Sequence, residues 1–306
     1  MVDSPFLDVI GIPERLFMLP NFLVIGVQKA GSSWLVERIG DHPDVFMATR
    51  EAHFFNDHFE EGLDWYEKKF SDWSGEKRVG EGSPGYISHP LAAERIKSAL
   101  GADVKLIGSL RHPVDRAYSA YWMSLTNNRI PRDSDFRTLF AEDVKLGLHA
   151  RGCYADHMDR MFSHFPRENV RIFIQEEDMR SRGPETLRAC YEFLDIDPDF
   201  VSERARERAN QGQDLRSGGA ALQRVAQLLG PPARSLPGAL LRPMQKAYHA
   251  MMARLPMRER YKELDADLRQ ELLEGYLPQI HRLEDLLERD LSVWYGKSPS
   301  PARADS

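Results

Sequence analysis

This sequence of 306 residues contains little cysteine and no long hydrophobic run. Its two cysteines, Cys153 and Cys190, lack the spacing of a metal site, so we expect buried free thiols in a reducing compartment. A disulfide between them is the alternative. No basic segment followed by an apolar core opens the chain, and no stretch approaches the roughly 18 apolar residues of a membrane span. These absences predict a cytoplasmic protein, and we infer a bacterial source.

The chain also lacks an excess of positive charge. Its 41 Lys and Arg residues against 47 Asp and Glu give a net charge of −6. This balance argues against general binding to nucleic acid and leaves room only for a local basic cleft. A hydrophobic content of 42% and a charged content of 29% are typical of a packed globular protein rather than a disordered one.

Short apolar runs alternate with amphipathic patterns along the chain. We expect strands at residues 22–27, 77–80, 104–110 and 170–174. Helices are expected from Ser32 and at residues 62–70, 91–100, 114–125, 154–165, 184–194, 264–273 and 279–287. This alternation predicts an α/β protein with a central parallel sheet flanked by helices. A single domain is expected over residues 1–296, with an irregular Pro-rich insert at 231–258 and a flexible tail at 297–306.

The most informative segment is residues 22–34, FLVIGVQKAGSSW. It combines a predicted buried strand, a turn between Gly26 and Gly31, and a helix that begins near Ser32. The first N–H groups of a helix have no partner within the helix, and the helix dipole favours negative charge there. The segment is therefore typical of a cradle for an anion. A purely structural glycine turn is the alternative.

The loop differs from the Walker A motif of nucleoside triphosphate sites. Gly26 and Gly31 have the Walker spacing, but Ser32 stands where that motif has its lysine. The lysine lies within the loop instead, as Lys29. A triphosphate site needs a lysine on the terminal phosphates and a hydroxyl on Mg²⁺. We therefore expect a shorter anion beside Lys29 and no bound metal.

A second informative segment is residues 110–122, LRHPVDRAYSAYW. Arg111 follows a predicted strand, and Ser119 lies two helical turns further along. A guanidinium at a strand end and a helical hydroxyl can converge on one phosphate, because arginine supplies a fork of donors. The alternative is that Arg111 pairs with Asp115 and Ser119 is exposed on the helix surface.

Together and in this order, the two segments resemble the sulfotransferases that use 3′-phosphoadenosine 5′-phosphosulfate (PAPS). The first resembles their 5′-phosphosulfate loop, and Arg111 and Ser119 match the residues that hold the 3′-phosphate. The resemblance spans roughly residues 20–200, with a weaker echo at 283–294, and several spaced motifs are more specific than one glycine-rich loop. It implies a P-loop-like three-layer fold, PAPS as co-substrate, PAP as product and no metal.

The resemblance also implies roles for the first loop. Lys29 would neutralise charge that builds on the bridging oxygen during transfer, and Trp34 would pack near the adenine. The residues implied in binding the nucleotide here are Gln28, Lys29, Ala30, Gly31, Ser32, Ser33 and Trp34.

Residues 50–56, REAHFFN, resemble a segment of the heparan-sulfate-type glycan sulfotransferases whose glutamate acts as a base. The matching residue is Glu51, with His53 beside it. A hydroxyl must lose its proton as it attacks sulfur, so either group could serve. A solvated loop carboxylate is the alternative for Glu51. In residues 79–86 the animal glycan enzymes carry a lysine where this chain has Gly82, which argues against a heparan-like acceptor.

The polar stretch 204–216 is a further candidate. Sulfotransferases often close a basic, glycine-containing loop over the nucleotide late in the chain. By this resemblance Asn210 and Arg216 are candidate nucleotide ligands. A solvated, charged helix end is the alternative.

The sequence thus predicts a sulfotransferase that acts on a hydroxyl or amine of a carbohydrate or small molecule. A P-loop kinase-like phosphotransferase is the first alternative, although it would need a Walker lysine and Mg²⁺ ligands. A non-catalytic nucleotide-binding protein is the second, although it would have no use for a base at Glu51. We expect no nucleic-acid partner, and neither the acceptor nor the oligomeric state is indicated.

Overall fold

The computed structural model is built around a sheet of five parallel strands in the order β2-β3-β1-β4-β5. It describes residues 18–48, 51–143, 146–205, 215–216, 257–259 and 262–296. The strands are β1 (Phe22–Gly26), β2 (Val45–Met47), β3 (Arg78–Gly82), β4 (Lys105–Leu110) and β5 (Val170–Ile174). A separate antiparallel pair joins β6 (Leu215–Arg216) and β7 (Met257–Glu259).

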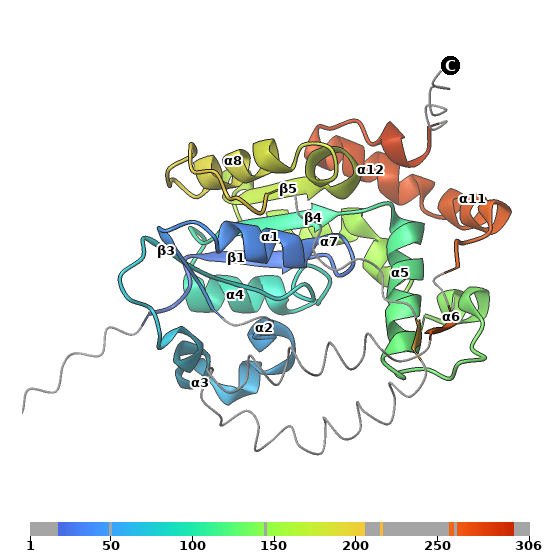
Figure 1. Ribbon diagram of the computed structural model, residues 1–306, viewed down its shortest axis with the longest axis horizontal. Coiled ribbons are helices and arrows are strands. Elements are labelled where there is room, and N and C mark those ends of the chain that lie inside the picture. The colour runs from blue at the N-terminus through green and yellow to red at the C-terminus, as the bar shows by residue number, and fades with distance from the viewer. Residues whose placement is uncertain are drawn as a thin grey trace, which may run out of the picture.

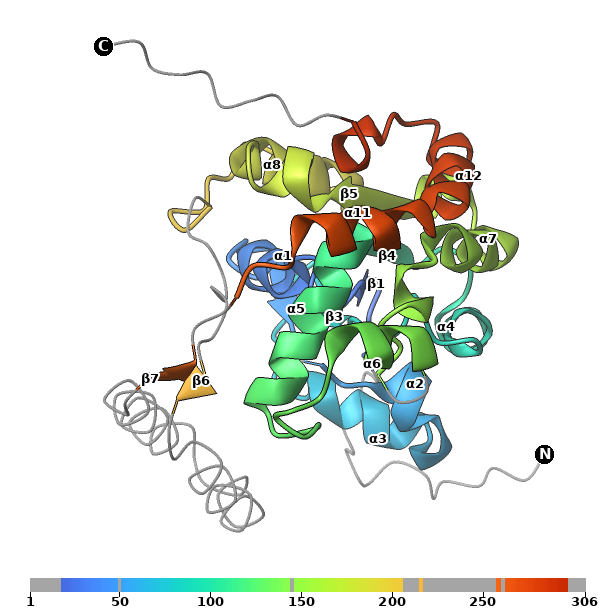
Figure 2. The same cartoon turned by 90° about the vertical axis from the view of Figure 1, so that its right-hand side faces the viewer.

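Helices cover both faces of the sheet (Figure 1). They are α1 (Ser32–Ile39), α2 (Phe54–Asp57), α3 (Leu63–Glu67), α4 (Ala92–Leu100), α5 (Pro113–Thr126), α6 (Phe136–Glu142), α7 (Tyr154–His164), α8 (Gly183–Phe193), α11 (Ala266–Glu274) and α12 (Leu277–Leu287). A π-helical turn, η5 (Gln175–Met179), follows β5. Figure 2 shows α1 and α8 on one side of the strands and α4 and α7 on the other. The predicted three-layer α/β fold is confirmed.

The core has two parts because alternate residues of a strand point to opposite faces of the sheet. In β1, Phe22 and Val24 enter a smaller cluster beneath α1 and α8. Leu23 and Ile25 enter a larger cluster beneath α4 and α7. All of these side chains have no exposed surface, and burying each contributes roughly 1.5–3 kcal/mol. The continuous apolar run that predicted a strand reflects burial on both faces.

The four predicted strands correspond to β1, β3, β4 and β5, with ends shifted by a residue or two. Strand β2 was missed because it has three residues and lies at the edge of the sheet. The expected single helix over 62–70 was wrong, since α3 ends at Glu67 and a 3₁₀ turn, η2 (Lys68–Phe70), follows. Helices α2 and α6 were not expected.

The two cysteines are free, so the alternative of a disulfide was wrong. Cys190, within α8, is fully buried, and Cys153 is half-buried at the start of α7. The expected insert at 231–258 lies outside the described residues, except for its last two, which begin β7. The expected tail at 297–306 also lies outside them.

The segment after residue 262 is tied to the acidic turn η5. Arg289, just beyond α12, donates to Asp178 at 2.8 and 2.9 Å and to Glu177 at 2.7 Å. Trp294, in the last 3₁₀ turn η6 (Ser292–Trp294), is 2% exposed and packs in the larger core cluster. Residues 283–294, where the family resemblance is weaker, therefore pack in the same domain as the sheet.

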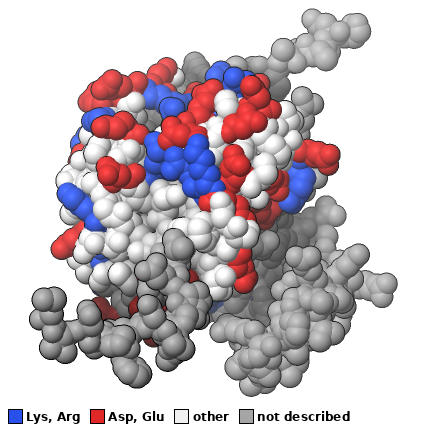
Figure 3. Space-filling view, turned by 90° about the vertical axis from the view of Figure 1, so that its left-hand side faces the viewer, with Lys and Arg blue, Asp and Glu red and all other residues white. Residues whose placement is uncertain are grey.

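Charged side chains of both signs are interspersed on the face where the strands begin (Figure 3). Basic residues there gather around acidic ones. Arg78 and Lys105, at the starts of β3 and β4, both approach the Asp195 carboxylate, at 2.8 and 3.5 Å. Among the described residues of this face, acidic neighbours thus offset part of the basic charge. Across the ranges that the structure describes, no helix is both long and apolar enough to cross a membrane.

Candidate functional site

The candidate site lies where the parallel strands end. Strands β1, β3 and β4 are neighbours and run in the same direction, so their carboxyl ends meet at one edge of the sheet. Ligands of open α/β sheets bind at this edge. The loops that leave these strands carry the segments singled out in the sequence.

The first of these loops joins β1 directly to α1. Gly31 is the N-cap of α1 and has a φ of 94°, which favours glycine. A Cβ at this position would lie 2.7 Å from Met179 Cε. Because glycine has no side chain that could accept from the first-turn N–H groups, the helix start suits an anion. The expected strand–loop–helix arrangement is confirmed.

The remaining loop residues differ in their surroundings. Gln28 Oε1 accepts a hydrogen bond from Arg151 Nη1 at 3.0 Å. Ala30 is fully buried, Ser32 is 8% exposed, and Ser33 is half-buried. Trp34 is buried in the smaller core cluster and packs near Gly183 of α8. Its packing near an adenine stays a prediction.

Lys29 links the loop to two other segments. Its backbone has a positive φ of 74°, and its carbonyl accepts a hydrogen bond from Arg111 Nη1 at 3.2 Å. Burial and the neighbouring Arg111 charge lower the pKa of Lys29, while the Glu51 carboxylate opposes this shift. The structure therefore brings Lys29, Arg111 and Glu51 together from three distant parts of the sequence.

Arg111 follows β4 and does not pair with Asp115, so that alternative was wrong. Asp115 instead accepts hydrogen bonds from Arg269 of α11 at 2.7 and 3.0 Å. The Arg111 Nε is a buried donor with no acceptor among the described residues. Ser119 is half-buried on α5, two turns beyond Arg111. A buried donor without an acceptor is costly, so Arg111 suits an anionic ligand.

The turn that carries Arg111 is held from several sides. The Tyr154 hydroxyl donates to the Arg111 carbonyl at 2.8 Å. The Glu176 carboxylate accepts from the backbone N–H of His112 and from Trp294 Nε1, each at 3.1 Å. Pro113 is the first residue of α5, where its missing N–H costs no hydrogen bond. These contacts fix the direction of the chain where it leaves β4.

Glu51 and His53 form a hydrogen-bonded pair, with 3.1 Å between Glu51 Oε2 and His53 Nε2. The Glu51 side chain is 50% exposed and that of His53 is 30% exposed. The hydrogen bond from Glu51 raises the pKa of His53, with smaller help from Asp57 and against the effect of burial. The imidazole therefore holds a proton more readily than usual and can exchange it with the carboxylate.

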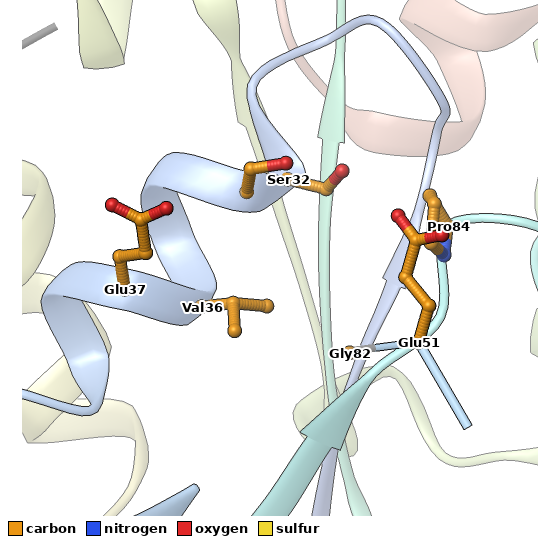
Figure 4. Close-up of a pocket in the computed structure, with 7 residues that line it drawn as sticks. Ser32, Val36, Glu37, Glu51, Gly82 and Pro84 are labelled. Carbon is orange, nitrogen blue, oxygen red and sulfur yellow. The ribbon is translucent and has the colours of Figure 1, made fainter. Parts of the chain in front are cut away.

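A pocket opens between the start of α1 and the Glu51 loop. Figure 4 shows Glu37 and Glu51 on opposite sides of it, with Gly82 between them. The lining residues are Ser32, Ser33, Val36, Glu37, Glu51, Gly82 and Pro84. A Cβ at Gly82 would lie 2.2 Å from Val36 Cγ2, so a lysine at this position would require Val36 to move. Glycine at this position thus lets Val36 pack directly against β3.

The polar stretch 204–216 lies mostly outside the described residues. Asn210 lies outside the described residues. Arg216 is described only through its backbone, as the second residue of β6, where it pairs with β7. Neither the predicted closing loop nor its alternative is tested.

The sequence analysis missed one buried carboxylate near the site, Glu81. It lies in β3 with no exposed surface. Had the expected strand at 77–80 been extended by one residue, it would have placed Glu81 inside a buried strand. A charged residue in such a place needs buried partners. Arg151, which donates to Gln28 in the loop after β1, has no sequence feature that would have predicted this contact. No group of three or more metal-ligating side chains occurs within the described ranges.

Comparison with known proteins agrees with this geometry. Residues 19–212 match the family described as the sulfotransferase domain. Heparan sulfate glucosamine 3-O-sulfotransferase 6 of Homo sapiens is 29% identical, over 80% of this chain and 73% of its own length. Membrane-associated sulfotransferase kil1 of Dictyostelium discoideum is 34% identical, over 45% of this chain. The match covers only 31% of that relative's length.

A solved structure is similar over nearly its whole length. The sulfotransferase from Alicyclobacillus acidocaldarius superposes with a TM-score of 0.66 and 28% identity. The match covers 91% of this chain and 99% of that one. With the match over residues 19–212, this similarity establishes that the chain belongs to the sulfotransferase family.

Proposed function

We propose that this protein transfers a sulfuryl group from PAPS to a hydroxyl or amine of a carbohydrate or small-molecule acceptor. One observation carries the proposal. Lys29 lies within the electrostatic influence of both Arg111, on the side expected to bind the nucleotide, and Glu51, on the side expected to meet the acceptor. Lys29 is therefore close enough to interact electrostatically with both the proposed nucleotide site and the candidate base.

The donor side fits a nucleotide with phosphates at two positions. The backbone N–H groups at the start of α1 and the hydroxyls of Ser32 and Ser33 would hold the 5′-phosphate. Arg111 offers its buried Nε, and Ser119 would complete the 3′-phosphate site. A 3′-phosphate distinguishes PAPS from ATP, so Arg111 would provide the selectivity.

Lys29 would stabilise the charge that leaves with the nucleotide. As the bond from sulfur to the acceptor oxygen forms, the bond from sulfur to the 5′-phosphate oxygen breaks, and negative charge grows on that oxygen. A lysine already in position costs no reorganisation at that moment. Because the transferred group is charged and the protein forms no bond to it, positioning and electrostatics should account for most of the rate, by analogy with phosphoryl transfer.

Glu51 and His53 would remove the proton that the acceptor loses. Their 3.1 Å hydrogen bond lets a proton taken by one group be shared with the other. Either could contact the acceptor directly. Because position 82 is a glycine, this side of the pocket carries no lysine side chain, which favours acceptors other than a heparan-like polysaccharide.

Nucleotide preference tests the proposal. PAP should raise the melting temperature, because a ligand that binds the native state stabilises it, by roughly 2.7 kcal/mol at a concentration of 100 times Kd. ATP with Mg²⁺ should do much less. Equal shifts from both ligands would remove the 3′-phosphate assignment and favour the kinase-like alternative. PAP binding without any turnover across a broad acceptor screen would favour a non-catalytic nucleotide-binding protein.

The proposal extends to the chain as a whole. We assign residues 1–296 to one sulfotransferase domain and the protein to the bacterial cytoplasm. The contacts between Arg289 and the turn η5 support the first assignment, because they join the C-terminal helices to the sheet. No metal is needed for the chemistry proposed.

A further inference from the structure

A carboxylate with no exposed surface lies beneath the Glu51–His53 pair. Glu81, in the central strand β3, accepts hydrogen bonds from three hydroxyls. Tyr86 donates at 2.6 Å, Ser83 at 2.9 Å and Tyr66 at 3.2 Å. A buried charge is costly unless its partners satisfy it, and these three hydroxyls do so.

Two of the three hydroxyls have a second partner, the backbone of the Glu51–His53 loop. Ser83 Oγ accepts from the His53 N–H at 2.9 Å. The Tyr86 hydroxyl accepts from the Phe54 N–H at 2.9 Å. The peptide N–H groups of the consecutive residues His53 and Phe54 are thus linked to one buried carboxylate, each through a hydroxyl.

Burial raises the pKa of Glu81, and the hydrogen bonds from its three hydroxyl partners oppose this shift. As a carboxylate, Glu81 sets the direction of these hydrogen bonds. A carboxylate only accepts, so each hydroxyl must give its single proton to Glu81. The oxygen of each hydroxyl is then free to accept from a loop N–H. A neutral amide at position 81 would bring donors of its own and would compete for the same hydroxyl oxygens.

The fastened loop has a conformation that its residues seldom adopt. Glu51 and His53 have positive φ angles of 51° and 50°, which are uncommon for residues with side chains. The backbone N–H of Glu51 also donates to the Gly82 carbonyl at 3.0 Å. In this conformation the two side chains meet at 3.1 Å. Such a conformation persists where surrounding contacts impose it.

We propose that Glu81, Ser83 and Tyr86 form a positioning network that holds Glu51 and His53 in contact for acceptor activation. The inference rests on the proposed function, since it gives the network its purpose. None of the three residues is expected to touch the acceptor. They act through the loop backbone.

Tyr66 provides a matched control. It is as deeply buried as Tyr86 and also donates to Glu81, but it makes no hydrogen bond to the loop backbone within the described residues. Replacing either tyrosine with phenylalanine keeps the ring and removes one hydroxyl. Each change therefore removes one hydroxyl donor from Glu81, the shorter bond in Tyr86→Phe and the longer one in Tyr66→Phe, while only Tyr86→Phe also releases the Phe54 N–H.

The test measures the pKa of His53 by NMR titration of the PAP-bound protein. The charged groups that face His53 are Glu51, at 3.1 Å, and Asp57 of α2, at 3.8 Å. Because Glu51 is the main cause of the raised pKa, separating the pair should move it back toward the ordinary value. We expect this fall in Tyr86→Phe and in Ser83→Ala. Tyr66→Phe should leave the value at that of the wild type.

Three further measurements sharpen the test. Ser83→Thr keeps the hydroxyl and should retain the wild-type pKa of His53. Melting temperatures identify any general loss of stability, and PAP affinity should be unchanged in every variant. The network is supported if the pKa of His53 falls in Tyr86→Phe or in Ser83→Ala but not in Tyr66→Phe. It is overturned if the pKa of His53 is unchanged in both Tyr86→Phe and Ser83→Ala, or if Tyr66→Phe lowers it equally. Failure of the wild type to bind PAP would overturn the proposed function instead, and the His53 titration could still be read in the free protein.

Discussion

The donor side and the acceptor side of the site are built in different ways. On the donor side, Lys29 and Arg111 lie a few residues beyond β1 and β4, so short segments of chain determine where they lie. On the acceptor side, Glu51 and His53 lie in a loop whose backbone is held by residues some thirty positions further along the chain. Local sequence therefore places the residues proposed to bind the nucleotide, whereas long-range contacts hold the residues proposed to activate the acceptor.

The two sides also shift their ionisable groups in opposite directions. Burial and Arg111 lower the pKa of Lys29, and the bond from Glu51 raises the pKa of His53. The Glu51 carboxylate contributes to both, since it favours the charged form of each neighbour. Changing this one residue should therefore disturb the acceptor side most while leaving the nucleotide phosphates bound.

The largest effect is expected for Glu51→Gln, which keeps the shape and removes the proton-accepting oxygen. Turnover of PAPS with an acceptor identified by mass spectrometry should fall by roughly 10²–10⁴-fold. The acidic limb of the pH profile should disappear, and calorimetry should show intact PAP binding. Normal turnover in Glu51→Gln together with a large loss in His53→Ala would assign the base to His53 instead.

A second large effect is expected for Lys29→Ala, which acts where the two sides meet. Loss of the positioned charge should reduce turnover by about 10²-fold or more. PAP affinity should fall less, because PAP lacks the sulfuryl group. Steady-state rates beside calorimetric titrations measure both quantities. Near-normal turnover in a folded variant would remove Lys29 from the mechanism.

Arg111→Ala tests the donor side alone. Loss of a charge-assisted fork should weaken PAP binding by about 1.5–3 kcal/mol, which is roughly 10- to 150-fold in Kd. Arg269→Ala is a suitable control, because Arg269 lies near the same turn but pairs with Asp115. Equal losses in the two variants would indicate a general disturbance of the turn rather than a phosphate ligand.

The smallest effect is expected on the free energy of unfolding, from the ion pair between Asp115 and Arg269. Burial raises the pKa of Asp115. The hydrogen bonds and charge of Arg269, together with His112, lower it by more, so the pKa lies below its usual value. A depressed carboxylate pKa stabilises the fold above the unfolded pKa of about 3.9, and this contribution disappears as pH falls through the folded value. Asp115→Asn should therefore cost about 1 kcal/mol in urea unfolding at pH 7 and less at pH 2. An equal cost at both pH values would show that packing, not charge, is responsible.

The difference between the two sides also explains what the sequence could predict. The strand, loop and helix around Lys29 and the turn after β4 could be predicted because their signals lie within about a dozen consecutive residues. The role of Glu81 could not be predicted from the sequence, since it depends on which hydroxyls the fold brings to β3. The pairing of Asp115 with Arg269 could not be predicted either, because the two residues are 154 positions apart in sequence.

The contact of Glu176 with both His112 and Trp294 has a consequence for how the protein is made. Glu176, which holds the turn that carries Arg111, gains its full set of hydrogen bonds only when residue 294 has left the ribosome and packed. Chains emerge at roughly 5–20 residues per second, so about ten seconds or more separate synthesis of the two ends of this link. During that interval the growing chain has its phosphate loop and its Arg111, but the turn between β4 and α5 lacks its final support. Nucleotide-binding competence would thus be among the last properties that the nascent protein acquires.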